Sequence, residues 1–180
     1  MQTIISSLLR KQWNLYGNSN LEPRRTNTLF FEHNPNMVLE QPSPTHFTIS
    51  LNGDDKLRVI SASEMSVAAV RDTIKSCWLK GIQKESRYAG SWEFKLRGNP
   101  WWPSGDEAVE TRFLILKLMD TLQARGWSPV VAIDSSRKLS DKSCLIFRES
   151  PPTHSPFFCV SLNETDLMRL INVPEDVVEV

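Results

Sequence analysis

The stretch that decides the fold is Ser91–Trp127, which reads SWEFKLRGNPWWPSGDEAVETRFLILKLMDTLQARGW. At its start, Trp92, Phe94 and Leu96 alternate with charged residues. This period of two is typical of a strand with one buried face and one face in solvent. The tripeptide Gly98-Asn99-Pro100 follows and predicts a turn. The stretch therefore begins as a strand that stops sharply.

A helix is predicted next, from about Asp106 to Arg125. Ser104 and Glu107 have the spacing of a capping box, in which each side chain satisfies a backbone N–H group at the start of a helix. Gly126 suits the left-handed position that commonly follows the last turn. The run Phe113–Met119 is apolar nearly all round, so we expect this helix to be the most buried one.

The rest of the chain adds strands and a second main helix. His46–Ser61 alternates on both sides of the turn Asn52–Asp55 and predicts a hairpin. A second capping box, Ser61 and Glu64, opens an amphipathic helix that ends near Gly81. Three more short strands are predicted at 129–134, 144–148 and 157–162. This order indicates an α+β fold, with a largely antiparallel mixed sheet packed against two main helices and further helices at the N- and C-terminal ends.

The chain is predicted to divide into three parts. Residues 1–45 form a helix, in which the apolar residues of Ile4–Trp13 have helical spacing, and then an irregular Pro- and Asn-rich arm that packs on the domain. Residues 46–174 form a single α+β domain, whose last helix begins at Asn163 and stops before Pro174. Residues 175–180 form an acidic tail.

Composition excludes several partners. Lys and Arg together number 21, equal to Asp and Glu together, so we expect no nucleic acid and no membrane surface as partner. Another protein is the expected partner, with a small molecule as the alternative. The three cysteines are scattered, and neither a signal peptide nor an apolar run of about 18 residues is found. We therefore expect a cytoplasmic protein, with the nucleus as the alternative.

The sequence contains no recognisable catalytic motif. The three histidines are isolated from one another, and no two cysteines lie close together, so no metal site is expected. Phosphate-binding loops, dinucleotide-binding loops and nucleophile elbows are also missing from the sequence, and we expect neither a catalytic residue set nor a cofactor. An enzyme remains the least favoured hypothesis, and it would need dispersed polar residues to converge in a cleft: Asp106, Glu107, Arg112 and Arg137.

Two segments are candidate binding sites. Trp101 and Trp102 stand between two prolines, and two indoles on such a stiff turn can form a platform for a Pro-rich peptide, a sugar ring or another apolar ligand. The alternative is that they close the end of the core; we expect one indole buried and one partly exposed. The polar loop that carries Arg137, Lys138 and Lys142 suits a phosphate or an acidic peptide, and its alternative is a solvated hairpin loop.

Four motifs carry a resemblance to a known family. They are GNPW at 98–101, GDEAV at 105–109, RGW at 125–127 and SRKLSDKSCLIF at 136–147. In this order they resemble a family of uncharacterised eukaryotic proteins, over roughly Ser91–Arg148. The resemblance implies a single domain and supplies no activity, cofactor or catalytic residue.

The leading hypothesis is a non-enzymatic protein-interaction domain that uses the Trp101-Trp102 turn and the loop of Arg137, Lys138 and Lys142. The alternative is a small apolar-ligand-binding domain, in which the apolar helix and the sheet leave a cavity. Its expected lining is aromatic: Trp92, Phe94, Phe113 and Trp127.

Overall fold

A six-stranded antiparallel sheet organises the computed structural model, which describes residues 2–19, 28–37, 44–134, 142–163 and 167–178. The strand order is β5-β6-β4-β3-β8-β7, and each neighbouring pair is antiparallel. Two main helices and the sheet together make an α+β fold, as the sequence predicted. The strands of this sheet are β3 His46–Asn52, β4 Lys56–Ile60, β5 Ile82–Tyr88, β6 Ser91–Leu96, β7 Trp127–Ile133 and β8 Cys144–Glu149.

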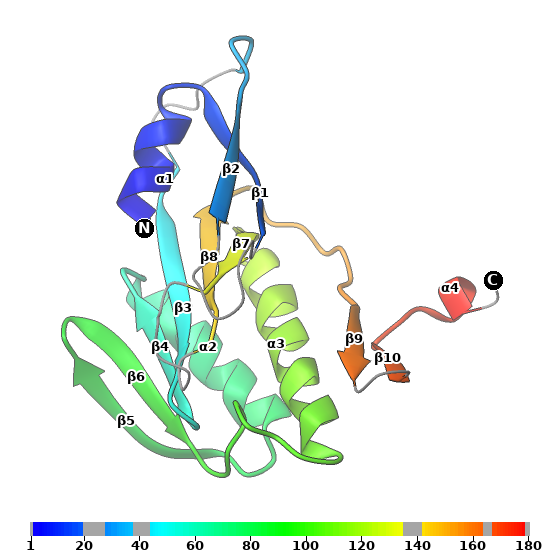
Figure 1. Ribbon diagram of the computed structural model, residues 1–180. Coiled ribbons are helices and arrows are strands. Elements are labelled where there is room, and N and C mark those ends of the chain that lie inside the picture. Colours follow the sequence, from blue (N-terminus) through cyan, green and yellow to red (C-terminus); the bar gives the residue numbers. More distant parts are fainter. Residues whose placement is uncertain (1, 20–27, 38–43, 135–141, 164–166, 179–180) are drawn as a thin grey trace.

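The helices α2 (Glu64–Cys77) and α3 (Glu107–Gln123) cover one face of the sheet (Figure 1). Alternate strand residues point toward them, which places the rings of Phe47 and Phe147 in a stack with centroids 5.1 Å apart. Leucines of α3 and apolar residues of α2 complete this main core. The prediction that α3 is the most buried helix is wrong, because the shorter α2 has as many buried residues.

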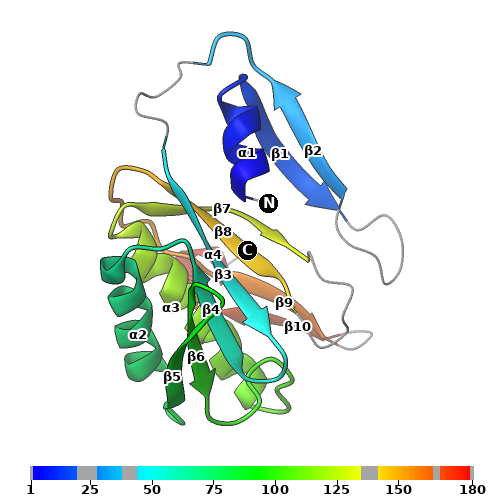
Figure 2. The ribbon, with the colours of Figure 1, turned by 90° about the vertical axis from the view of Figure 1, so that its left-hand side faces the viewer.

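The N-terminal segment covers part of the opposite face. It consists of α1 (Gln2–Leu9) and the hairpin of β1 (Trp13–Ser19) with β2 (Thr28–His33), which lie near β7 and β8 (Figure 2). Ile5 packs there with Ile133 and Ile146 in a second, smaller core. Leu15 and Leu29 also pack against this second core. The predicted arm is not irregular throughout, because residues 28–33 form a strand. Trp13 begins β1, so the predicted helix is too long.

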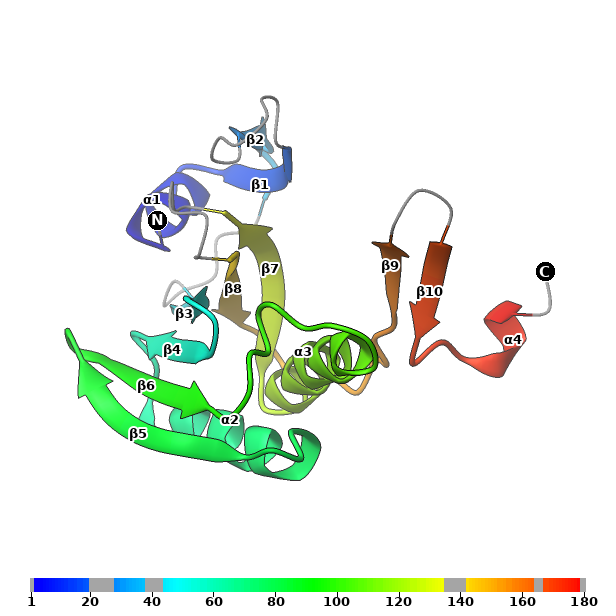
Figure 3. The same cartoon turned by 60° about the horizontal axis from the view of Figure 1, so that its bottom comes forward.

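A separate two-stranded hairpin follows the sheet. It pairs β9 (Cys159–Asn163) with β10 (Leu167–Ile171) and lies beyond α3 (Figures 1 and 3). The helix predicted from Asn163 is therefore wrong: Leu167, Leu170 and Ile171 have helical spacing but belong to a strand. The short α4 (Glu175–Val178) stands in the region predicted as an acidic tail.

The helix starts also differ from the two predicted capping boxes. Ser63 is the N-cap of α2, and its Oγ accepts a hydrogen bond from the Ser66 N–H at 3.2 Å. Ser61 lies outside the helix with a positive φ of 59°. At α3 the N-cap is Asp106, whose side chain makes no capping hydrogen bond. Gly126 does take the left-handed conformation, with φ of 85°.

Candidate functional site

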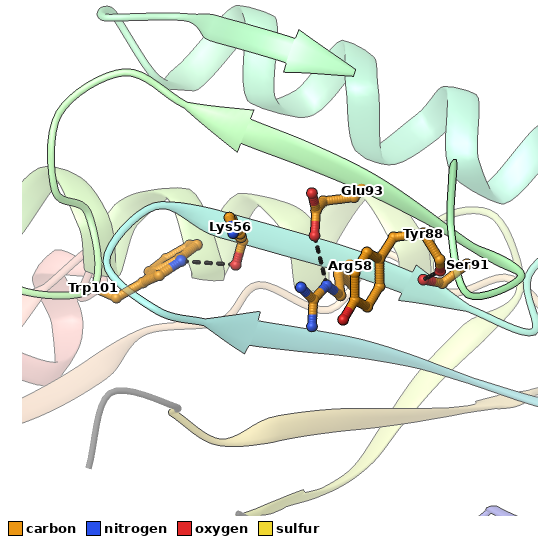
Figure 4. A network of polar contacts seen from close by, with 6 residues as sticks. All are labelled: Lys56, Arg58, Tyr88, Ser91, Glu93 and Trp101. Atoms are coloured by element: carbon orange, nitrogen blue, oxygen red, sulfur yellow. Dashed lines mark hydrogen bonds and ion pairs between the residues drawn. The ribbon is translucent and has the colours of Figure 1, made fainter. Parts of the chain in front are cut away.

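The predicted tryptophan turn lies at the end of the sheet where the β3–β4 hairpin turns. Trp101 is 5% exposed, and its Nε1–H donates a hydrogen bond to the Lys56 carbonyl oxygen at 2.9 Å (Figure 4). Its backbone N–H donates to the Asp54 carbonyl oxygen at 3.1 Å. Trp101 therefore connects the loop between β6 and α3 to the hairpin through two hydrogen bonds. Its indole is part of the core rather than a binding platform.

Trp102 has the opposite environment. Its side chain is 53% exposed, so the expected division into one buried and one partly exposed indole is confirmed. The Nζ of Lys142 lies 3.6 Å from the centroid of the Trp102 ring, within cation–π range. The Lys142 N–H donates to the Leu51 carbonyl oxygen at 3.0 Å, which fixes the backbone beside β3. The fold thus brings two predicted site residues together, whereas Arg137 and Lys138 lie outside the described residues.

Charged side chains near β4 and β6 neutralise one another. Arg58 Nε contacts Glu93 Oε2 at 2.7 Å, and the Arg58 guanidinium lies 3.9 Å from the centroid of the Tyr88 ring (Figure 4). The Ser91 hydroxyl donates to the Tyr88 carbonyl oxygen at 2.5 Å. This network holds the β5–β6 hairpin against β4. Each charge has a structural partner, so the network does not resemble a proton-transfer site.

Two of the polar residues in the enzyme hypothesis, Glu107 and Arg112, make separate structural contacts. Glu107 Oε1 pairs with Lys80 Nζ at 2.9 Å, and Arg112 Nη1 donates to the Ala108 carbonyl oxygen at 2.6 Å on its own helix. Arg137 lies outside the described residues. Among the described residues no group of three His, Cys, Asp or Glu side chains could hold a metal ion.

Two titratable groups have perturbed pKa values. Burial raises the pKa of the Cys159 thiol above its usual value, and the nearby Arg112 charge lowers it by a smaller amount. A raised pKa keeps this thiol protonated at neutral pH and makes it a poor nucleophile. Burial also lowers the pKa of His46, as does the Arg148 charge, while a backbone hydrogen bond with Pro44 opposes the shift.

The aromatic residues expected to line one cavity are divided among several contacts. Trp92 and Phe94 are near neighbours on β6, with ring centroids 6.5 Å apart, and Phe94 is fully buried in the main core. Trp127 packs edge-on against Phe47, with centroids 4.8 Å apart. The centroid of the Phe113 ring lies 5.2 Å from the Lys117 Nζ. The sheet and α3 therefore hold these rings as parts of packing rather than as the wall of one shared cavity.

The β9–β10 hairpin presents a surface that sequence reasoning missed. One face buries Ser161 and Ile171, with the hairpin packed beside α3. The cross-strand pairs on the other face join Val160 to Leu170 and Leu162 to Met168. These four apolar side chains, called the hairpin face below, are between 44% and 81% exposed. The alternation of Val160 and Leu162 in the sequence was a signal for this face, but the helical spacing of residues 167–171 concealed its second strand.

A comparison with protein families locates the common part of the chain. A family model described only as a domain, with no activity in its description, matches residues 45–148. The chain belongs to this family. No curated protein and no solved structure matches the chain.

The family domain coincides with the six-stranded sheet. The match begins one residue before β3 and ends one residue before the end of β8, so it includes all six strands with α2 and α3. It is longer than the segment that carried the sequence resemblance. The N-terminal segment and the hairpin face lie outside it. None of the helices in the described ranges is both long enough and apolar enough to cross a membrane.

Proposed function

We propose that this chain is a non-enzymatic protein-interaction domain and that the hairpin face is its main docking surface. The observation that carries the proposal is the exposure of four large apolar side chains on one side of a hairpin whose other side buries Ser161 and Ile171. Contiguous apolar surface of this kind is typical of sites where a protein contacts another protein. An isolated two-stranded sheet is also marginal in water, so a partner layer would stabilise it.

The chemistry of the hairpin face defines the partner. Val160, Leu162, Met168 and Leu170 carry no charge, so the complementary surface is an apolar patch on another protein, with polar groups only at its rim. Methionine adapts its shape readily and suits a partner surface of irregular relief. Trp102 with Lys142 offers a second, smaller contact, in which an aromatic and a cation are presented together.

The proposal is tested by affinity capture with matched variants. Leu162→Ser and Met168→Ser change exposed residues of the hairpin face, whereas Leu79→Ser changes an exposed leucine outside it. Trp102→Ala removes the second contact. Each variant is first checked for an unchanged circular dichroism spectrum and melting temperature. Proteins captured by the wild type are then compared with those captured by each variant, and size-exclusion chromatography with light scattering reports any self-association.

A protein that is retained by Leu79→Ser and lost by both hairpin variants supports the hairpin face. A protein lost only with Trp102→Ala moves the docking surface to the tryptophan turn. Self-association that disappears in the hairpin variants identifies the partner as a second copy of the chain. If folded Leu162→Ser and Met168→Ser retain every partner of the wild type, the hairpin face is not a docking surface.

A further inference from the structure

A pocket of about 410 Å³ lies where the first turn of α2 meets the last turn of α3. Its volume falls within the roughly 300–1,000 Å³ range of small-molecule sites. The Trp127 ring forms one wall and is held edge-on against Phe47, so this wall is rigid. The pocket lies inside the family domain, away from the hairpin face. Its lining is mostly apolar and consists of Ser63, Met65, Ser66, Leu122, Arg125 and Trp127.

The polar groups that line the pocket differ in whether they already make hydrogen bonds within the protein. The Ser63 and Ser66 hydroxyls lie 3.0 Å apart, and Ser63 Oγ also accepts the Ser66 N–H. These hydroxyls are therefore already engaged in capping α2. Arg125 is exposed, and within the described part of the chain no ion pair or hydrogen bond engages its guanidinium. The guanidinium is thus the one charged group of the lining, and no described residue engages it.

Neighbouring charge does not oppose an anion at this position. Glu64 stands in the first turn of α2, but its Oε1 pairs with Arg87 Nη2 at 2.5 Å. A single guanidinium matches one anionic group, since it binds a carboxylate through paired N–H donors. The apolar walls of Met65, Leu122 and Trp127 offer few partners to a sugar or a nucleotide, which carry many hydroxyl or phosphate groups.

We propose that this pocket binds a small apolar molecule that carries one carboxylate or similar anionic group. The apolar part of the ligand contacts Trp127 and Leu122, and Arg125 holds the anionic group at the pocket. This site is separate from the protein-docking proposal, because no residue of the hairpin face lines it.

Two fluorescent probes of nearly the same shape test the proposal. The probe 1-anilinonaphthalene-8-sulfonate carries one negative charge, and N-phenyl-1-naphthylamine is its uncharged relative. Arg125→Met keeps an apolar stem and removes the charge, and Arg97→Met is the matched control at an exposed arginine outside the pocket. We expect Arg125→Met to weaken the anionic probe by about five- to tenfold, as for loss of one charge-assisted contact, and the neutral probe by less than about twofold.

A second pair of variants locates the probes. Met65→Ala removes an exposed lining residue and should weaken both probes, whereas Leu79→Ala removes an exposed apolar residue elsewhere and should weaken neither. Leu162→Ser should leave both probes unaffected. Equal affinity of the anionic probe for the wild type and Arg125→Met overturns the proposal, as does loss of binding with Leu162→Ser or absence of saturable binding. The results for the Arg125 and Met65 variants do not bear on partner capture by the hairpin face, because neither residue belongs to it.

Discussion

The Lys142 ammonium lies 3.6 Å from the centroid of the Trp102 ring, although α3 and β7 separate the two residues in the sequence. Trp102 is half exposed beneath this cation, while the adjacent Trp101 is buried and bonded to the β3–β4 hairpin. Two neighbouring tryptophans therefore have different tasks. One stabilises the fold, and the other supplies surface.

This difference predicts unequal costs for two alanine substitutions. Trp101→Ala removes a buried indole and its hydrogen bond to the Lys56 carbonyl oxygen, so we expect a loss of about 3–5 kcal/mol in the free energy of unfolding. Trp102→Ala removes an exposed ring and one cation–π contact, and we expect a loss within about 1 kcal/mol. Urea unfolding measures both values. Similar losses in the two variants would contradict the assignment of separate tasks.

His46 predicts a loss of stability in mild acid. Burial and the Arg148 charge lower the pKa of His46 in the folded state below its unfolded value of 6.5. The unfolded state therefore binds the proton more readily, and the contribution of His46 to stability is fully present above pH 6.5. It decreases as the pH falls from 6.5 toward the folded pKa. Urea unfolding at a series of pH values measures this decrease.

His46→Gln provides the comparison, because glutamine does not titrate. The carboxylates and the other histidines contribute the same pH dependence to the stability of both proteins. The wild type should therefore lose more stability between about pH 7 and pH 5 than the variant does. The Ser6 Oγ lies 2.9 Å from His46 Nδ1, and weaker attachment of α1 should accompany the loss. Parallel pH profiles for the two proteins would refute this role.

The Arg58–Glu93 pair predicts a measurable coupling energy. Both side chains are less than a third exposed, and Arg58 also lies over Tyr88. We therefore expect a double-mutant cycle with Arg58→Met and Glu93→Gln to give a coupling of about 1 kcal/mol, above the value usual for exposed pairs. The exposed pair of Arg87 and Glu64 is the control, and its coupling should be smaller. A coupling near zero for Arg58 and Glu93 would mean that the two changes act independently.

The sequence predicted the centre of the fold because its patterns there are simple. Trp92, Phe94 and Leu96 alternate in the sequence, and β6 follows that alternation with Phe94 and Leu96 in the core. Gly126 ends α3 in the expected left-handed conformation. Burial on one face imposes these periods, so strands and helices with one well-buried face are readable from sequence.

Elements without such a face were missed. β5 reads IQKESRY and is an edge strand of the sheet, where exposed polar residues give no alternation. β10 reads LMRLI, which fits a helical period as well as a strand period, and only pairing with β9 decides between them. At the N-terminus, Gln12 takes a positive φ of 63° and ends α1 earlier than its apolar spacing indicates.

The candidate surfaces were predictable to different degrees. The place of Trp101 and Trp102 between a strand and a helix that both bury apolar faces predicted one buried and one partly exposed indole, but the sequence did not indicate which of the two is exposed. Its contact with Lys142 depends on the pairing of β8 with β3, which local sequence does not specify. The hairpin face was missed for another reason: the type of an apolar residue does not indicate whether its side chain is buried or exposed. The exposure of these side chains depends on the pairing of β9 with β10, which decides the face of the hairpin on which each residue lies.

Two glycines give a last, matched prediction about the end of α3. Gly126 has a φ of 85°, and a Cβ there would lie 2.8 Å from the Ser150 carbonyl oxygen. That backbone is fixed, since the Ser150 N–H donates to the Gly126 carbonyl oxygen at 2.9 Å. Gly81 has a similar φ of 75°, but a Cβ there would meet open space.

Gly81→Ala therefore reports the conformational cost alone, about 1–2 kcal/mol in the free energy of unfolding. Gly126→Ala adds the steric clash with Ser150, so we expect it to cost at least about 1 kcal/mol more. Urea unfolding of the two variants and the wild type measures the difference. Because Gly126 separates Arg125 from Trp127, the same variant should also weaken probe binding in the pocket. Equal costs for the two glycines would show that the Ser150 segment moves aside freely.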